Sequence, residues 1–532
     1  MKSMCKALWQ YIEGINGVIL IIYSLLVSIT HIFISTKSTN YFLRWSFISM
    51  LLCIILCPIL MKWSRKMSIN TVYTSHNAKD SVKWKLLLFA IPFVVFLIRF
   101  IACYPGGLTY DSLAQYEQAI ENNYNDWHPV IHTLLAFKLP LALTGGWTGS
   151  IVLFQITLFS FVVAYALFSI KQHTNPSYVI MALFFIILNP RTLNMAVSPW
   201  KDVWFALGAL LLITYALHIY YTKGEWLKSP THTVIFILTV VLTTLLRHNA
   251  LLFTIPLLFA IALIIKPKKT LVICLSTVAL LFAVKYPLYS LLDVENPDKR
   301  QAEMLGLPMT IIGAAVTNAP ETLDEEILEF AYKVSPQEVW ENKYTYGSFN
   351  DVKWDERTNN DVIEEYGTIK ILSMTADCIK NCPNESIQGL IKLTNPVYTI
   401  TDDYNVIFTP TIPENEYNIE HHGIPKLDSL ITKATVALNM LFPHIFLYLG
   451  AMHLTLLVLM MAKYKLNKWK DWKKIFFILP VFVYNFGTTF LLTGAQDAFR
   501  FFYYTFLIMP VLLVFLCRKE QERGMEFSVC ER

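Results

Sequence analysis

Residues 86–102 read LLLFAIPFVVFLIRFIA, an apolar run with a single charge, and CYPGGLTYDSLAQ follows directly at 103–115. A helix rises about 1.5 Å per residue, so roughly 20 apolar residues cross the hydrocarbon core of a bilayer. The run is therefore typical of a membrane span. The Pro-Gly-Gly sequence after it indicates a turn, which leaves a polar loop at one membrane surface.

Apolar runs of this kind recur along the chain. Only 16% of the 532 residues are charged and the mean hydropathy is +0.45, whereas soluble proteins carry about 25% charged residues. A large soluble core would explain one or two such runs, not this many. The sequence predicts a polytopic α-helical membrane protein with about 12 transmembrane helices. The other long runs are 17–33, 45–61, 151–170, 203–220, 271–291, 438–461 and 499–517.

Basic residues give the chain a direction across the membrane. They gather in short loops at 62–85, 266–269 and 463–474 and at the start of the C-terminal tail. Short loops rich in Lys and Arg face the cytoplasm. The intervening connections are then expected on the outer face, among them the long segment from 293 to 434.

The long outer segment differs in charge from the rest of the chain. Residues 293–428 hold 25 Asp and Glu against 10 Lys and Arg, a net of −15 in a chain of net +5. We expect a small extracytoplasmic α or α/β domain here, in which a short Cys378–Cys382 disulfide stays an open question. The predicted organisation is two N-terminal transmembrane helices and a cytoplasmic loop at 1–85, a transmembrane module at 86–292 with its first outer loop at 103–147, the extracytoplasmic domain at 293–434, and C-terminal transmembrane helices and a cytoplasmic tail at 435–532. Within the first outer loop, residues 129–143 form either a re-entrant helix or a poor span.

Unusual polar residues cluster at the predicted outer ends of the spans. Asp111 and Gln115 share one face of a short helix, and Lys201 and Asp202 begin a span. A mutual salt bridge would explain the second pair about as well as a site role. The sequence Arg247-His248-Asn249 fills a turn for which uncharged residues would suffice, and Asp497 and Arg500 precede the last span. Arg500 also has a simple explanation, because its side chain can snorkel to the interface.

One carboxylate and several cations on the same membrane face suit a lipid-linked phosphate donor. A carboxylate can accept the proton of an attacking hydroxyl as a general base. Lys and Arg can hold a phosphate and stabilise the charge that develops as it leaves. A phosphate leaving group needs no general acid, so a single carboxylate suffices for sugar transfer.

These residues resemble the GT-C superfamily of membrane glycosyltransferases, and a poorly characterised bacterial multi-pass family within it. The resemblance is carried by Pro105-Gly106 through Asp111 and Gln115, by His128-Pro129, Lys201-Asp202, Arg247-His248-Asn249, and by Asp497 and Arg500. It implies transfer of a sugar from a polyprenyl-phosphate donor to a glycan, lipid or protein acceptor, at the outer face of a bacterial plasma membrane.

The resemblance also implies roles for single residues. Asp111 would be the general base, with Asp202 able to share that role, and Lys201, Arg247, His248 and Arg500 would face the donor phosphate. The residues expected to contact substrate are Tyr104, Tyr110, Gln115, His128, Asn249 and Asp497. Many superfamily members have two adjacent acidic residues in the first outer loop, but here Ser112 follows Asp111. This departure favours a metal-independent mechanism. The transfer is expected to be inverting and to need no cofactor.

Three other functions compete with this interpretation. A polymerase or ligase of lipid-linked polysaccharide would use several outer arginines, and Arg191, Arg247 and Arg500 are available. A transporter or flippase would place charges near the middle of its spans, which are almost wholly apolar here. A non-catalytic scaffold would not need Arg247 and His248 in a tight turn. Nucleic-acid binding is not expected, because the basic residues lie in short cytoplasmic loops.

Overall fold

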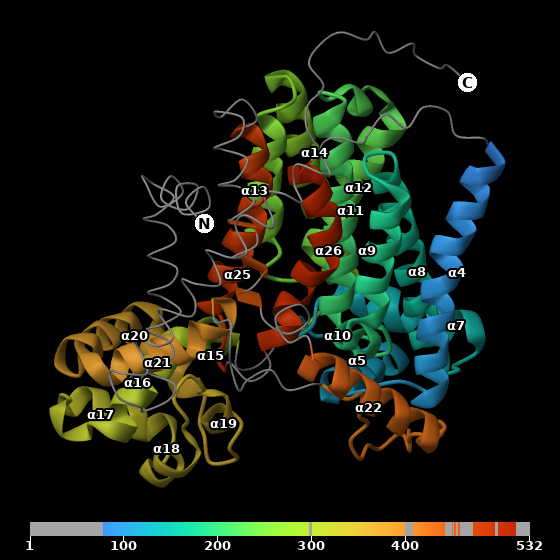
Figure 1. Cartoon of the computed structure of the whole chain (residues 1–532). Helices are drawn as coiled ribbons and strands as arrows, with labels where there is room; N and C mark the ends of the chain where they lie inside the picture. The colour runs from blue at the N-terminus through green and yellow to red at the C-terminus, as the bar shows by residue number, and fades with distance from the viewer. Residues whose placement is uncertain are drawn as a thin grey trace, which may run out of the picture.

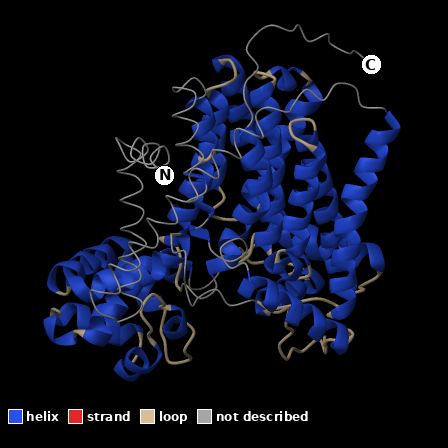
Figure 2. Cartoon of the chain, in the orientation of Figure 1, coloured by secondary structure: helices blue, strands red, loops and turns tan. Residues whose placement is uncertain are grey.

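The computed structural model describes residues 78–296, 300–398, 408–441, 472–494 and 498–517, with three short pieces between 449 and 457 (Figure 1). Every regular element in these residues is a helix, and the β structure there is limited to isolated bridges (Figure 2). The predicted α-helical class is confirmed. The predicted spans at 17–33 and 45–61, most of the span at 438–461, Asp497 and the C-terminal tail lie outside the described residues.

A bundle of apolar helices forms the larger part of the structure (Figure 1). Its members are α4 (Ala78–Ala102), α8 (Gly149–Lys171), α9 (Pro176–Leu188), α10 (Pro190–Ala196), α11 (Lys201–Tyr221), α12 (Pro230–Leu245), α13 (Leu251–Ala262), α14 (Pro267–Leu291), α25 (Leu479–Thr489) and α26 (Ala498–Cys517). Within the described residues, α4, α8, α11, α14 and α26 are long and apolar enough to cross a membrane. The chain is therefore a multi-pass membrane protein.

The described part contains fewer full-length spans than the dozen expected for the whole chain. Helices α9 and α10 would add a sixth span, but they meet at a bend of 65°. Pro190 cannot continue α9, and the Asn189 side chain accepts a hydrogen bond of 2.9 Å from the backbone N–H of Arg191, which starts a new helix. Helices α12 and α13 have only 16 and 12 residues.

Helix α11 is the centre of the bundle, and α14 lies at its edge. In the most apolar window of α11, 89% of the residues are buried, against 11% for α14. Helix α11 packs along α8, α12 and α26. The contact with α12 is close, because a Cβ atom on Gly208 would lie 2.3 Å from Oγ1 of Thr243. A helix that is apolar on all sides is stable only in such surroundings or in lipid.

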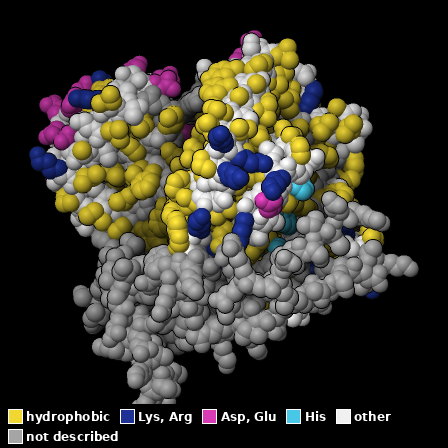
Figure 3. Space-filling model, turned by 90° about the horizontal axis from the view of Figure 1, so that it is seen from above, with side chains coloured by type: hydrophobic (Ala, Val, Ile, Leu, Met, Phe, Trp, Pro, Cys, Tyr) yellow, Lys and Arg dark blue, Asp and Glu magenta, His cyan; other side chains and the backbone are white. Residues whose placement is uncertain are grey.

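The two ends of the bundle differ in charge. At the end where α14 begins and α26 finishes, here called the basic end, the connections carry Lys223, Lys228, Lys266, Lys268 and Lys269. Figure 3 views the molecule from this end and shows Lys and Arg side chains gathered on the bundle. The opposite end, here called the site end, carries a short helix α5 (Tyr110–Glu121). Beside α5 lie α6 (Val130–His132), a π-helical turn (Thr133–Lys138) and α7 (Leu139–Thr144), a segment too short to count as a span.

Seven helices form a separate domain at the site end, here called the acidic domain. They are α15 (Arg300–Met304), α16 (Gly306–Asn318), α17 (Glu325–Val334), α18 (Gln337–Lys343), α19 (Asn350–Lys353), α20 (Asp361–Asn381) and α21 (Pro383–Thr394). They enclose their own hydrophobic core, in which Phe330, Trp340 and Phe349 are fully buried. Of the two predicted alternatives for this domain, all-α is the one observed.

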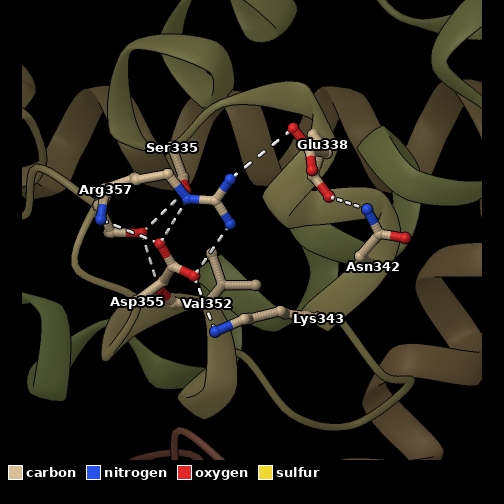
Figure 4. Close-up of polar contacts among 8 residues, drawn as sticks. Ser335, Glu338, Asn342, Lys343, Val352, Asp355 and Arg357 are labelled. Atoms are coloured by element: carbon tan, nitrogen blue, oxygen red, sulfur yellow. Dashed lines mark hydrogen bonds and ion pairs between the residues drawn. The ribbon is translucent and has the colours of Figure 1, made fainter.

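Polar contacts fix the loop between α19 and α20 (Figure 4). Arg357 donates to Asp355 through Nε at 3.0 Å and Nη2 at 3.3 Å, and Nζ of Lys343 lies 2.8 Å from the same carboxylate. Hydrogen bonds from Arg357 and Lys343 hold the pKa of Asp355 well below its usual range. Cys378 and Cys382 are both buried free thiols, so no disulfide links them.

An irregular segment at 408–424, here called the strap, returns from the acidic domain across the site end. Its backbone donates from His422 to the Tyr104 carbonyl at 2.8 Å and from Ile424 to the Ala102 carbonyl at 3.1 Å. Helix α22 (Pro425–Leu441) follows and is tied to α4 by an ion pair between Asp428 and the buried Arg99. Helix α22 thus crosses the domain boundary predicted at 434.

Candidate functional site

A tight turn after α4 places Asp111 at the site end. Gly106 has a φ of +116°, and a Cβ atom there would lie 2.6 Å from Cγ2 of Val152 and 2.7 Å from the Val197 carbonyl oxygen. Only glycine fits this position, so the turn presses against α8 and the α10–α11 link. Thr109 occupies the N-cap position of α5, and Asp111 lies in the first turn of that helix, where the helix dipole favours a negative charge.

Gln115 follows Asp111 by one helical turn, as predicted. It was expected to contact substrate, but its side chain forms hydrogen bonds within the protein. Its side chain is 1% exposed and its Oε1 accepts hydrogen bonds from Nδ1 of His132 at 2.6 Å and Oγ1 of Thr133 at 3.2 Å. Its Nε2 donates to the backbone carbonyl of Asp111 at 3.2 Å. Gln115 therefore fastens α5 to the segment of α6 and the π-helical turn, and so positions Asp111.

Asp111 meets Arg500 from the start of α26. Nη1 of Arg500 lies 2.6 Å from Oδ2 of Asp111, and the two side chains are 19% and 30% exposed. The Arg500 guanidinium also stacks on Trp200 at 5.3 Å and Phe501 at 5.1 Å from the ring centroids. Trp200 is held in turn, because its Nε1 donates to Oγ1 of Thr109 at 2.8 Å.

Lys201 and His128 form a second polar pair beside Asp111. Nζ of Lys201 lies 3.0 Å from Nδ1 of His128. Burial, followed by the charge of Lys201, lowers the pKa of His128 well below its usual value. His128 is therefore a neutral imidazole near pH 7, and its Nδ1 accepts a hydrogen bond from the Lys201 ammonium.

The surrounding charges decide the protonation state of Asp111. Burial alone would raise the pKa of its carboxyl, but Arg500, and to a lesser extent Lys201, outweigh burial and hold the pKa well below the ordinary value. Asp111 is therefore a carboxylate at neutral pH. It can accept a proton, and the cations around it can bind an anion.

Asp202 and Arg247 form a buried ion pair, with side chains 1% and 6% exposed. The alternative of a local salt bridge between Lys201 and Asp202 is therefore wrong, because Asp202 pairs with Arg247 and Lys201 with His128. The Arg247 guanidinium also lies 4.6 Å from the centroid of Phe501, a ring that it shares with Arg500. The guanidinium groups of Arg247 and Arg500 thus contact the same phenyl ring beside the site.

The turn Arg247-His248-Asn249 joins α12 to α13, as predicted. Nε of Arg247 donates to Oδ1 of Asn249 at 2.7 Å, and Nδ2 of Asn249 donates to Oγ1 of Thr488 in α25 at 2.9 Å. Nε2 of His248 bonds the backbone carbonyl of Asp126 at 3.1 Å. Burial, then Lys201, lowers the pKa of His248 to about 4, so it offers a neutral imidazole and no positive charge at neutral pH.

The remaining predicted residues lie apart from this cluster or outside the described residues. The Tyr104 hydroxyl accepts a hydrogen bond of 2.7 Å from Nε1 of Trp147, and its carbonyl holds the strap. Tyr110 is 76% exposed. Asp497 falls in a part of the chain that the structure does not describe. The structure thus brings together Asp111, His128, Lys201 and Arg500, with the Asp202–Arg247 pair beside them.

Sequence reasoning missed several residues of the site. Trp200 lies under Arg500, and Phe408 of the strap packs on Trp200 at 4.5 Å between ring centroids. Asp126 accepts a hydrogen bond of 2.6 Å from the Tyr289 hydroxyl and anchors His248. Asp126 and Trp200 lie close to His128-Pro129 and Lys201-Asp202 in the sequence, and this position is a usable signal. Phe408 had none, because only the fold brings it to the site.

No three His, Cys, Asp or Glu side chains in the described ranges come together as a metal-binding group. Compared with protein-family models, with curated proteins and with solved structures, the chain matches none of them.

Proposed function

We propose that this protein is a membrane glycosyltransferase that moves a sugar from a polyprenyl-phosphate donor to a hydroxyl of a glycan, lipid or protein acceptor. The observation that carries the proposal is the meeting of Asp111 with Arg500, next to Lys201 and His128, at one end of a membrane bundle. An ionised carboxylate beside two fixed cations supplies both the base and the phosphate site of such a transfer.

The reaction would proceed by direct displacement at the anomeric carbon. The acceptor hydroxyl gives its proton to the Asp111 carboxylate, and its oxygen forms a bond to the anomeric carbon. The bond between that carbon and the phosphate oxygen breaks, and its electron pair leaves with the polyprenyl phosphate. Arg500 and Lys201 stabilise the charge on this leaving group, and the sugar inverts.

The Arg500–Asp111 pair suggests how donor binding prepares the base. A phosphate competes with Asp111 for the guanidinium, and a bidentate Arg–phosphate contact is strong. As Arg500 turns to the phosphate, the pKa of Asp111 rises and the carboxylate becomes a better proton acceptor. The resting pair keeps both charges compensated until the donor arrives.

The proposed orientation puts this chemistry on the outer face of a bacterial plasma membrane. The support is the separation of lysines, which gather at the basic end, from the site end. Loops rich in lysine stay in the cytoplasm during insertion. The site end and the acidic domain then face outward, where a lipid-linked donor can enter from the membrane.

A second function, polymerisation or ligation of lipid-linked polysaccharide, has one observation in its favour. Arg247 and Arg500 contact the same Phe501 ring, at 4.6 Å and 5.1 Å from its centroid. Two guanidinium groups at one site suit a diphosphate-linked donor. Asp202, however, already compensates Arg247. The donor that supports turnover, monophosphate or diphosphate, decides between the two functions.

The test uses the full-length protein in lipid nanodiscs, a panel of radiolabelled polyprenyl-phosphate sugars, and membranes of the source cell as acceptor. Asp111→Asn is expected to lower transfer by about 100-fold or more, as for loss of a general base. Glu117→Gln is the matched control, because it removes an exposed carboxylate from the same helix and should leave the rate unchanged. Full activity of Asp111→Asn would overturn the assignment.

Binding of polyprenyl phosphate tests the anion site separately. Lys201→Gln and Arg500→Gln should each weaken binding, whereas Lys228→Gln removes a charge at the basic end and should not. Equal binding by all three variants would place the phosphate elsewhere.

A further inference from the structure

The second half of α20 is a helix with two contrasting faces. Gly367, at φ +74° and ψ 156°, interrupts α20, so residues 368–381 form a helical piece of their own. On one face of this piece Ile371, Met374 and Cys378 are buried in the core of the acidic domain. The opposite face carries Ile369, Leu372 and Ile379.

These three side chains form an exposed apolar stripe. Ile369 is 86% exposed, Leu372 50% and Ile379 46%. Their spacings of three and seven residues put them on the same side of a helix, with the exposed Ala376 between them. Single exposed apolar residues are ordinary, but a row of them on one helix face indicates a binding surface.

The stripe faces the side of the domain that is turned toward the membrane. The buried face of α20 packs on α16 and α17. In Figure 1, α20 and α21 lie at the top of the acidic domain and α17 and α18 at the bottom, so the exposed face of α20 points toward the level of the bundle. Figure 3, seen from that direction, shows hydrophobic side chains over the acidic domain, with acidic ones toward the far edge.

Two contacts fix the domain where the spans leave the bilayer. The chain enters it directly after α14, whose last residue, Leu291, is 82% exposed, and Glu295 donates from its backbone to the Tyr124 carbonyl at 2.9 Å. On the other side, the backbone of Phe349 donates to the Thr493 carbonyl at 2.7 Å. The acidic domain is therefore held beside the site end, next to the end of α14.

The charge around the stripe also differs from the rest of the domain. Residues 368–381 hold Lys370 and Lys380 against a single Asp377, although the segment 293–428 has a net charge of −15. Lys370 pairs with Glu326 of α17 at 2.5 Å, so Lys380 is the ammonium group that can reach the lipid phosphates. A lysine beside an apolar stripe is typical of helices that lie in a membrane interface.

We propose that the acidic domain rests on the bilayer, with Ile369, Leu372 and Ile379 inserted into the headgroup layer of the same leaflet from which α14 emerges. The occupant of the stripe is lipid. This contact holds the domain beside the site end and does not depend on the reaction catalysed there.

The test places a fluorescent amino acid at position 369, 372 or 341 of the full-length protein in nanodiscs that contain anionic lipid. Glu341 is the control position, because it is an exposed residue of α18, which lies at the bottom of the acidic domain in Figure 1, away from α20. Nitroxide-labelled lipid should quench most of the emission at 369 and 372 and little at 341. Iodide in the buffer should give the reverse pattern.

Two results would overturn the proposal. Iodide quenching at 369 and 372 as strong as at 341 would mean that the stripe faces water. Protection from both quenchers would mean that protein covers it, either residues 1–77 or a second copy of the chain. The variant Ile369→Asp with Leu372→Asp should abolish lipid quenching of a probe at 379, while thermal unfolding shows that the domain remains folded.

Discussion

Arg500 donates a 2.6 Å hydrogen bond to Asp111 across 389 positions of sequence, and so joins the last described helix to the first polar loop of the bundle. Either charge alone would destabilise the fold at this place, because each side chain is partly buried and would lack its counter-charge. In the proposed reaction the pair is also the point where the base and a phosphate-binding cation meet, which makes it the most informative target for mutation.

Removal of Arg500 should shift the pH dependence of transfer. Arg500 favours the ionised form of Asp111, whereas burial opposes it. In Arg500→Gln the pKa of Asp111 therefore rises, and the acidic limb of the pH–rate profile moves to higher pH. Donor affinity should fall about 10- to 100-fold, since a hydrogen bond to a charged group contributes roughly 1.5–3 kcal/mol. Arg500→Lys keeps the charge and should keep the acidic limb near its original pH; an unshifted profile in Arg500→Gln would show that Asp111 is not the titrating base.

The Asp202–Arg247 pair should behave as a structural pair. Asp202→Asn leaves Arg247 buried without its counter-charge, which costs about 3–5 kcal/mol of stability. Thermal unfolding of the protein in detergent should show a large loss. The double variant Asp202→Leu with Arg247→Met removes both charges and should recover most of that loss. If the double variant is stable and still transfers sugar, neither residue is needed for catalysis; no recovery in the double variant would contradict the pairing.

Gly106→Ala should damage the turn that positions Asp111. The new methyl group would overlap Val152 and the Val197 carbonyl, at a φ of +116° that other residues avoid. Overpacking of this kind costs about 1–3 kcal/mol, and the rate of transfer should fall with stability. Gly145→Ala is the control, because Gly145 also has a positive φ, of +67°, but open space around its Cβ position. Equal losses in the two variants would show that backbone strain, not contact with α8, explains the effect.

Asp428→Ala should loosen the strap. Asp428 pairs with Arg99, which is 1% exposed and otherwise donates to Oδ1 of Asn194 at 3.1 Å. Without Asp428, the start of α22 loses its ionic link to α4, and limited proteolysis within residues 413–424 should become faster. Glu420→Ala removes the charge of an exposed residue within the strap itself. The protease should cleave this variant at the original rate. Identical cleavage of both variants would refute the anchoring role.

The features that sequence predicted well are those set by local pattern. Apolar length identified α4, α8, α11, α14 and α26, and the short helix with Asp111 and Gln115 on one face follows from spacing alone. The charged turn at 247–249 was also predictable, because helical runs on both sides leave it no other place.

The partners within the site were not predictable. Helix α11 is apolar on every side, so its sequence marks no face for α26, and only their packing brings Arg500 to Asp111. The packing of the helices also pairs Asp202 with Arg247, and not with its sequence neighbour Lys201. Phe408 reaches Trp200 from an irregular segment whose residues have no period to read.

The burial of α11 has a consequence for how the protein is made. Helix α11 is synthesised long before α26, yet α26 covers one of its sides. Until translation reaches residues 498–517, that side of α11 must be sheltered by lipid or by the insertion machinery. The proposed anion site is likewise incomplete until then, because Arg500 is synthesised with α26. Under the proposed function, any product that ends before α26 is inactive, which protects the cell from transfer by unfinished chains.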